Sequence, residues 1–199
     1  DGMNIEYNIS NALELFREEN KDKHTFLKDI RHIDSTLENF YNSRIGIRFL
    51  IGQHVTVQQK SIKDTHVGMI NTKCDPHTII KDAAHQVIEM VDGVYCQELE
   101  FDFGFTEKQS EFLYVPSHLF YIVLEVLKNA GKATAEFNGC SKPVKIKTSV
   151  SDKDFIIKIS DRGGGFSRDL MDKVFSFSYT TSGSKGKDDR ELQSLGIDR

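Results

Sequence analysis

This chain of 199 residues lacks long hydrophobic runs, paired cysteines and a strong net charge. No apolar run approaches the roughly 18–20 residues of a membrane span, so no membrane partner is expected. The net charge of −4 favours neither nucleic acid nor an anionic surface as a partner. The three cysteines are widely spaced and form no C-x-x-C pair. They argue against a disulfide framework or a zinc site and fit a reducing compartment.

The first third of the chain has helical periodicity over residues 23–59. A stripe of this length cannot stand alone in water, so it predicts part of a helical bundle. His54, at its end, is a candidate phospho-acceptor, although a lone histidine beside a core face is usually structural. The stripe consists of apolar residues spaced mostly three or four apart: Phe26, Ile30, Ile33, Leu37, Phe40, Ile47 and Leu50.

The pattern changes after this helix, which divides the chain into residues 1–72 and 73–199. Residues 60–76 are polar and predict an irregular connection. Asp75-Pro76 is typical of a helix start, and Asp92-Gly93 predicts its end. Further along, alternating apolar residues predict strands. The expected elements are strands at 99–103, 112–115, 144–148 and 155–160, and a helix from Ser117 to about Phe137.

These elements predict an α+β fold. A partial N-terminal helical bundle would precede an α/β sandwich domain with a mixed or antiparallel sheet and helices on one face.

The helix predicted between Ser117 and Phe137 has an unusual polar face. Glu125, Asn129 and Lys132 are spaced i, i+4 and i+7, so they share one side, with Lys128 on a neighbouring line. This pattern fits either a solvated surface or a binding site. The opposite side is expected to carry Ile122, Leu124, Val126, Leu127 and Ala133.

A glycine-rich turn, Asp161-Arg162-Gly163-Gly164-Gly165, directly follows the last apolar strand. Consecutive glycines permit positive φ angles and close approach of the backbone to a ligand. An aspartate at a strand end can accept a hydrogen bond from an exocyclic amino group such as that of adenine. Together with the polar helix, the turn predicts an ATP-binding cleft.

Residues 171–186 begin apolar and become rich in serine, threonine, glycine and lysine. Hydroxyls, backbone N–H groups and Lys185 suit a loop that covers phosphates. A flexible linker is the alternative interpretation.

The motif Glu125-x-x-Lys128-Asn129-Ala130-x-x-Ala133 resembles the N-box of the superfamily of gyrase, chaperone, histidine-kinase and mismatch-repair ATPases. Asp161-x-Gly163-x-Gly165 resembles the first glycine box of that superfamily. Within it, the chain is most similar to the mitochondrial 2-oxoacid dehydrogenase kinases, which comprise the pyruvate and branched-chain enzymes. The stretches that carry this resemblance are residues 40–54, 114–119, 125–133 and 159–165.

The resemblance implies a protein serine kinase that uses ATP and Mg²⁺ and inactivates the E1 component of a 2-oxoacid dehydrogenase complex. By position, Glu125 would be the general base for the substrate serine. Asn129 would bind Mg²⁺, which prefers oxygen ligands. Lys128 and Lys132 would line the nucleotide.

The same resemblance assigns the rest of the site. Asp161 would recognise the adenine amino group, and Gly163 and Gly165 would let the backbone close on the nucleotide. Thr180 and Thr181 match the hydroxyl pair at the start of the family's ATP lid. The family also implies a homodimer, docking to the E2 lipoyl domain and the mitochondrial matrix as location.

Three departures from the family qualify these expectations. Tyr121 stands where the pyruvate enzymes usually have histidine, so the substrate, pyruvate or branched-chain E1, stays open. Lys132 stands where the family usually has arginine, so the positive charge is kept but the planar guanidinium group with its paired N–H donors is lost. The second glycine box is missing between residues 187–190 and 191–199, so segments are left out or the chain is truncated. We therefore expect this stretch alone to bind nucleotide weakly or not at all. The alternatives are a non-catalytic nucleotide-switched interaction module and a histidine kinase.

Overall fold

The structure is a computed structural model of the chain. It describes residues 26–58, 65–106, 111–151, 154–171 and 174–176, together with Ile9, Ala12 and Leu15. The chain forms two compact units, one made of Asp1–Phe49 and Phe166–Arg199 and the other of Leu50–Gly165. The predicted division at residues 72 and 73 stays a prediction. Within the described ranges, no helix has the length and apolarity that a bilayer crossing requires.

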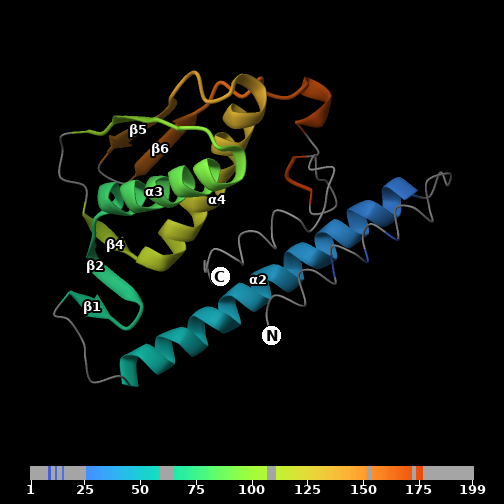
Figure 1. Ribbon diagram of the computed structural model, residues 1–199. Coiled ribbons are helices and arrows are strands. Elements are labelled where there is room, and N and C mark those ends of the chain that lie inside the picture. Colours follow the sequence, from blue (N-terminus) through green and yellow to red (C-terminus); the bar gives the residue numbers. More distant parts are fainter. Residues whose placement is uncertain are drawn as a thin grey trace. The chain divides into compact units, whose positions relative to one another are not determined.

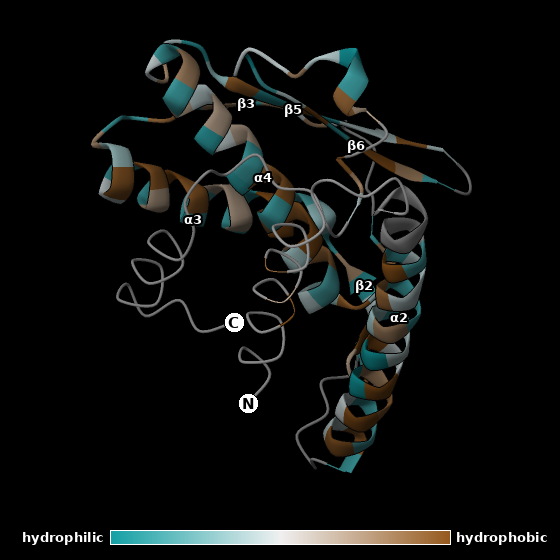
Figure 2. Cartoon of the chain, turned by 90° about the vertical axis from the view of Figure 1, so that its right-hand side faces the viewer, coloured by the Kyte–Doolittle hydropathy of each residue, from teal (hydrophilic) through white to brown (hydrophobic). Residues whose placement is uncertain are grey.

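A single long helix, α2 (Phe26–Gln58), confirms the helix predicted over residues 23–59 as far as the described residues extend (Figure 1). Figure 2 shows hydrophobic residues recurring along its length. Phe40, Ile47 and Leu50 of the predicted apolar stripe are exposed, Leu50 to 68%. The bundle partners that such a stripe requires therefore stay a prediction.

Residues 65–74 form a small hairpin, so the prediction of an irregular connection is wrong there. Strands β1 (His66–Val67) and β2 (Ile70–Cys74) are antiparallel, and β2 also pairs with β4 (Phe112–Tyr114). The Gln53 side chain holds the turn of this hairpin. Its Nε2 donates to the Val67 carbonyl at 3.0 Å, and its Oε1 accepts from the Met69 N–H at 2.8 Å. The hairpin is thus held by hydrogen bonds from a distant side chain, whereas its own sequence shows no clear alternation of apolar residues.

Helix α3 (Pro76–Tyr95) begins as predicted, because the Asp75 side chain accepts a hydrogen bond from the His77 N–H at 3.0 Å. Burial alone would raise the pKa of Asp75, but hydrogen bonds from Thr78 and His77 outweigh it and lower the pKa. The predicted end at Asp92-Gly93 is wrong, since the helix continues to Tyr95 and is capped by Cys96 at φ 51°. In this extra turn, the Tyr95 hydroxyl donates a hydrogen bond to Glu136 of α4 at 3.0 Å, and the Cys96 N–H donates to the Asp92 carbonyl at 2.9 Å.

Replacing Gly93 with alanine is expected to raise the free energy of unfolding by about 0.5–1 kcal/mol. A Cβ at this helical position meets nothing within 4 Å, so only the gain in helix propensity remains. Urea unfolding measures the change. Gly131→Ala is the matched control and should destabilise, because its Cβ would lie 3.0 Å from Val87 Cγ1. A lower midpoint for Gly93→Ala would contradict the prediction.

A second sheet has the strand order β3-β5-β6, formed by β3 (Phe101–Gly104), β5 (Val144–Val150) and β6 (Phe155–Ser160). Strand β3 is parallel to β5, and β5 is antiparallel to β6. This mixed sheet confirms the α+β class. The predicted strand at 112–115, which is β4, does not belong to it and lies in the sheet of β1 and β2. Alternate residues of β5 are buried, so one face of the sheet packs on the helices. A short 3₁₀ helix, η1 (Arg168–Leu170), lies in the other unit.

Helix α4 (Pro116–Asn138) confirms the helix predicted from Ser117 to about Phe137. The helix begins one residue before the predicted start at Ser117, because Val115 is the N-cap and Pro116 opens the helix. Helices α3 and α4 lie side by side in both views (Figures 1 and 2). Fully buried side chains that form the core between the two helices and β5 are Ile80, Val87, Val91, Val123, Leu127, Val144 and Ile146.

Candidate functional site

The glycine-rich turn begins where β6 ends. Asp161 Oδ1 accepts a hydrogen bond from the Gly163 N–H at 2.8 Å, which closes a local turn. Gly164 and Gly165 follow with φ angles of +81° and +66°, a region that side-chain-bearing residues rarely adopt. The two glycines therefore give the backbone a sharp change of direction directly after the aspartate.

This turn lies tightly against the C-terminal half of α4. A Cβ at Gly163 would come within 2.5 Å of Ala133 Cβ and 2.8 Å of the Ala133 carbonyl oxygen. Asn138 Nδ2 also donates a hydrogen bond to the Arg162 carbonyl at 2.9 Å. Packing and hydrogen bonding thus join the two motifs that the sequence predicted to line one cleft.

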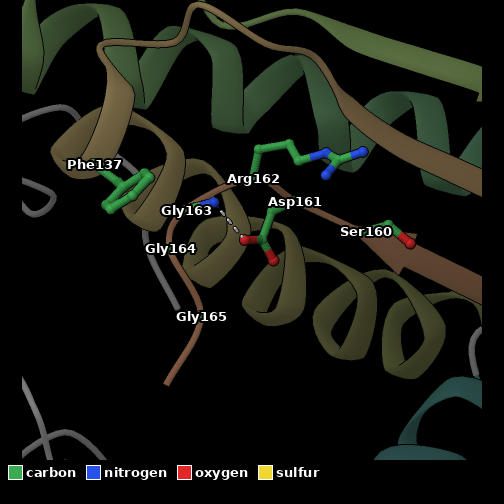
Figure 3. Close-up of a pocket in the computed structure, with 7 residues that line it drawn as sticks. All are labelled: Phe137, Ser160, Asp161, Arg162, Gly163, Gly164 and Gly165. Carbon is green, nitrogen blue, oxygen red and sulfur yellow. Dashed lines mark hydrogen bonds between the residues drawn. The ribbon is translucent and has the colours of Figure 1, made fainter. Parts of the chain in front are cut away.

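A depression of about 470 Å³ opens at the turn. Figure 3 shows the Asp161 carboxylate, with its hydrogen bond to Gly163, and the Phe137 ring near the glycines. Within the described part of the chain, Asp161 Oδ2 has no hydrogen-bond partner, so this exposed oxygen can accept from an exocyclic amino group. The depression is lined by Phe137, Ser160, Asp161, Arg162, Gly163, Gly164 and Gly165.

The predicted polar residues of α4 lie further toward its N-terminus and do not line this depression. Glu125 precedes Ala133 by eight residues, which is about 12 Å along a helix axis. The Glu125 carboxylate is half-buried and forms an ion pair with Lys128 at 3.2 Å. Lys132 Nζ lies 3.9 Å from Glu136 Oε1, and the Asn129 side chain is exposed.

Three apolar residues of α4, Ile122, Val126 and Ala133, were assigned to the wrong face. Ile122 and Val126 were expected opposite the polar residues, yet they are 53% and 45% exposed. Val126, Asn129 and Ala133 are spaced i, i+3 and i+7, so they share one side of the helix. That side continues to the contact of Ala133 with Gly163, and Asn129 lies on it between Val126 and Ala133.

Sequence reasoning also missed Phe137 and Asn138, which contact the turn from the last turns of α4. The sequence after the N-box gave no indication that these two residues contact the turn, because the contact depends on where β6 ends in space. The candidate lid residues Thr180 and Thr181 lie outside the described residues.

The arrangement fits a purine nucleotide with a magnesium ion. Asp161 offers a carboxylate oxygen, Oδ2, to which no other described residue donates a hydrogen bond, and the glycines leave room for close approach. Asn129 offers an exposed amide oxygen of the kind that Mg²⁺ accepts. Among the described residues, no cluster of three or more acidic, histidine or cysteine side chains could hold a metal ion. Phosphate oxygens and water would have to complete the coordination of such an ion.

Two family models match the chain. Residues 8–71 match mitochondrial branched-chain alpha-ketoacid dehydrogenase kinase. Residues 114–197 match the histidine kinase-, DNA gyrase B- and HSP90-like ATPase. The second match contains both α4 and the glycine-rich turn.

Curated relatives agree with these matches. The chain is 35% identical over 161 residues to the mitochondrial pyruvate dehydrogenase (acetyl-transferring) kinase of Schizosaccharomyces pombe, covering 77% of the chain and 37% of that protein. It is 33% identical over 162 residues to the corresponding kinase of Ascaris suum, covering 76% and 41%. For isozyme 1 of Homo sapiens the identity is 32% over 165 residues, covering 76% and 38%.

The chain thus spans about two fifths of the length of these relatives. Its N-terminal part matches a dehydrogenase-kinase model, and its C-terminal part matches the ATPase model. In the structure, the glycine-rich turn packs on α4, the helix that carries the N-box motif. This arrangement is consistent with the family models and with the curated relatives. The chain belongs to the family of mitochondrial 2-oxoacid dehydrogenase kinases.

Proposed function

We propose that the protein is an ATP-dependent serine kinase that phosphorylates and inactivates the E1 component of a mitochondrial 2-oxoacid dehydrogenase complex. The contact of Gly163 with Ala133 is the observation that carries the proposal, because it joins the Asp161 turn to the helix of Glu125 and Asn129. Relatives named as mitochondrial pyruvate dehydrogenase kinases support the substrate class.

The residues of α4 would perform the transfer. Glu125 would accept the proton of the substrate serine, since it is a carboxylate on the same side of the helix as Asn129. The exposed Asn129 amide would hold the metal ion, and Lys128 and Lys132 would place positive charge along the nucleotide. ATP would supply the phosphoryl group, and the Mg²⁺ ion bound with it would neutralise charge on the phosphates. The Glu125–Lys128 ion pair would have to open or shift when substrate binds.

The turn would bind the base and sugar side of the nucleotide. Asp161 would accept a hydrogen bond from the adenine amino group through Oδ2, while Oδ1 stays bonded to Gly163. Gly163 and Gly165 would let the backbone approach the ligand. Thr180 and Thr181 would contribute hydroxyls near the phosphates.

The wider assembly follows from the family alone. We propose a homodimer in the mitochondrial matrix that docks to the E2 lipoyl domain. The choice between pyruvate and branched-chain E1 is open, because the N-terminal family model is the branched-chain enzyme and the relatives above are pyruvate enzymes.

A kinase assay on full-length protein with the two E1 substrates in parallel tests the function. We expect acid-stable phosphoserine on one of the two E1 proteins. Nucleotide binding with no transfer to either would favour a switched interaction module. Acid-labile phosphate on His54 would favour a histidine kinase. His54 is exposed, and its Nε2 lies 3.0 Å from Gln58 Nε2.

In the full-length protein, replacing Asn129 with alanine is expected to weaken MgATP binding by about tenfold or more, a loss of at least about 1.4 kcal/mol. The amide oxygen that would hold the metal is removed, while the turn is untouched. Titration calorimetry with and without Mg²⁺ measures the change, and binding without Mg²⁺ should change little. Unaltered MgATP affinity would remove Asn129 from the metal role.

A further inference from the structure

An exposed aromatic ring lies beside the glycine-rich turn. The Phe137 side chain is 67% exposed, although burial of a phenyl ring is strongly favourable. It lines the same depression as Asp161 and the three glycines, and Figure 3 shows the ring near Gly163 and Gly164. Ligand sites combine apolar or aromatic surface with a few polar groups, and the lining of this depression has that composition.

The end of α4 that carries this ring is held in place by hydrogen bonds. Asn138 Nδ2 donates to the Arg162 carbonyl at 2.9 Å, and Asn138 Oδ1 accepts from the Ser141 N–H at 3.1 Å. Gly139 caps the helix in a left-handed conformation with a φ of 60°. The backbone of Phe137 is therefore fixed before a ligand binds, and a pre-organised surface reduces the entropic cost of binding.

Gly164 leaves room for the ring. It has a φ of +81°, and a Cβ at this position would lie 2.6 Å from Cδ2 and 2.7 Å from Cε2 of Phe137. A side chain there would displace the ring, the turn or both. One side of the ring thus contacts the turn, while most of its surface stays open to solvent.

The turn supplies a polar partner for this apolar surface. Asp161 Oδ1 accepts a hydrogen bond from the Gly163 N–H at 2.8 Å, whereas no described residue donates to Oδ2. Adenine combines a flat aromatic ring system with an exocyclic amino group at its edge. The carboxylate can accept a hydrogen bond from the amino group, and the Phe137 ring can contact the flat face.

We propose that Phe137 stacks on the purine ring of the bound nucleotide and contributes affinity independently of Asp161. The proposal rests on the proposed ATP-binding function and deepens it. Stacking of a base on an aromatic side chain strengthens binding by about five- to 150-fold. Phe137 would thus be a nucleotide-binding residue, remote from the reacting phosphate.

Equilibrium titration of full-length protein with two nucleotides tests the proposal. One is ATP, and the other is purine riboside triphosphate, which keeps the purine ring but lacks the amino group. Phe137→Leu should weaken binding of both by the same factor, about tenfold, because stacking does not need the amino group. Phe137→Trp keeps an aromatic surface and should bind both nucleotides at least as tightly as the unsubstituted protein.

Phe137→Trp also gives an optical signal. This chain contains no tryptophan, so the fluorescence difference between the variant and the unsubstituted protein reports on position 137. A purine stacked on the indole should quench this fluorescence. Both nucleotides should therefore quench it at saturation.

Phe103→Leu is the matched control. Phe103 lies on β3, is 39% exposed, and contacts the rings of Phe101 and Phe105 instead of the depression. Loss of these ring contacts should lower stability slightly and leave the affinity for both nucleotides unchanged. Thermal unfolding of each variant separates a loss of binding from a loss of folded protein.

Equal ATP affinities of Phe137→Leu and Phe103→Leu would overturn the stacking role. So would a loss for ATP without a loss for purine riboside triphosphate, because Phe137 would then act only by positioning Asp161. Failure of the proposed kinase function gives a different result. The unsubstituted protein would then bind both nucleotides with the expected pattern but transfer phosphate from ATP to neither E1 protein.

Discussion

Replacing Glu125 with glutamine is expected to lower phosphoryl transfer by about 10²- to 10⁴-fold, while ATP affinity changes by no more than about twofold. Glutamine keeps the shape of the side chain but cannot accept the serine proton at neutral pH. The lost ion pair with Lys128 contributes little, because the Glu125 carboxylate is 35% exposed. Single-turnover transfer to E1, measured beside equilibrium ATP binding, separates chemistry from binding.

Glu136→Gln is the matched control for this change. Glu136 is another carboxylate on α4 that pairs with a lysine four residues away, at 3.9 Å, but it lies eleven residues beyond Glu125. It also accepts a hydrogen bond from Tyr95 at 3.0 Å, so some loss of stability is expected. Transfer should stay near the level of the unsubstituted enzyme. If Glu125→Gln also transferred at that level, Glu125 would not be the base.

Local sequence patterns were enough to predict the two halves of the candidate site. The polar spacing of α4 and the aspartate with glycines after β6 depend only on helix geometry and backbone freedom. The structure adds the contact that joins them, Gly163 on Ala133. The roles of Glu125 and Asn129 in chemistry stay predictions, because they came from the family resemblance.

The errors arose where tertiary contacts decide local structure. Strand β2 alternates only weakly, and its hairpin is held by Gln53 from α2. Helix α3 passes Gly93, and Tyr95 in its last turn donates a hydrogen bond to Glu136 of α4 at 3.0 Å. Ile122 was predicted to lie on the buried face of α4 because it is apolar. It is exposed, which shows that its angular position around the helix, and not its apolarity, determines whether it is buried.

In the full-length protein, replacing Gly163 with alanine is expected to abolish measurable ATP binding and to destabilise the fold by about 1–3 kcal/mol. The new Cβ would lie 2.5 Å from Ala133 Cβ, 2.6 Å from its carbonyl carbon and 2.8 Å from its carbonyl oxygen. Two of these atoms belong to the backbone of α4 and cannot move aside. The turn would have to lift off the helix and carry Asp161 with it, losing the hydrogen bond from Asn138 to Arg162. Calorimetric ATP titration and urea unfolding measure the two effects.

Gly165→Ala separates a steric clash from backbone strain. Gly165 has a φ of +66°, but a Cβ there meets nothing within 4 Å. Its replacement should therefore lower stability by only the strain of a left-handed residue, about 1–2 kcal/mol, and leave the turn on α4. Combining Gly163→Ala with Ala133→Gly removes the 2.5 Å contact but not the two backbone contacts, so rescue should be partial. Full rescue would show that the side chain alone caused the clash, and no loss in Gly163→Ala would show that the turn does not need this close packing.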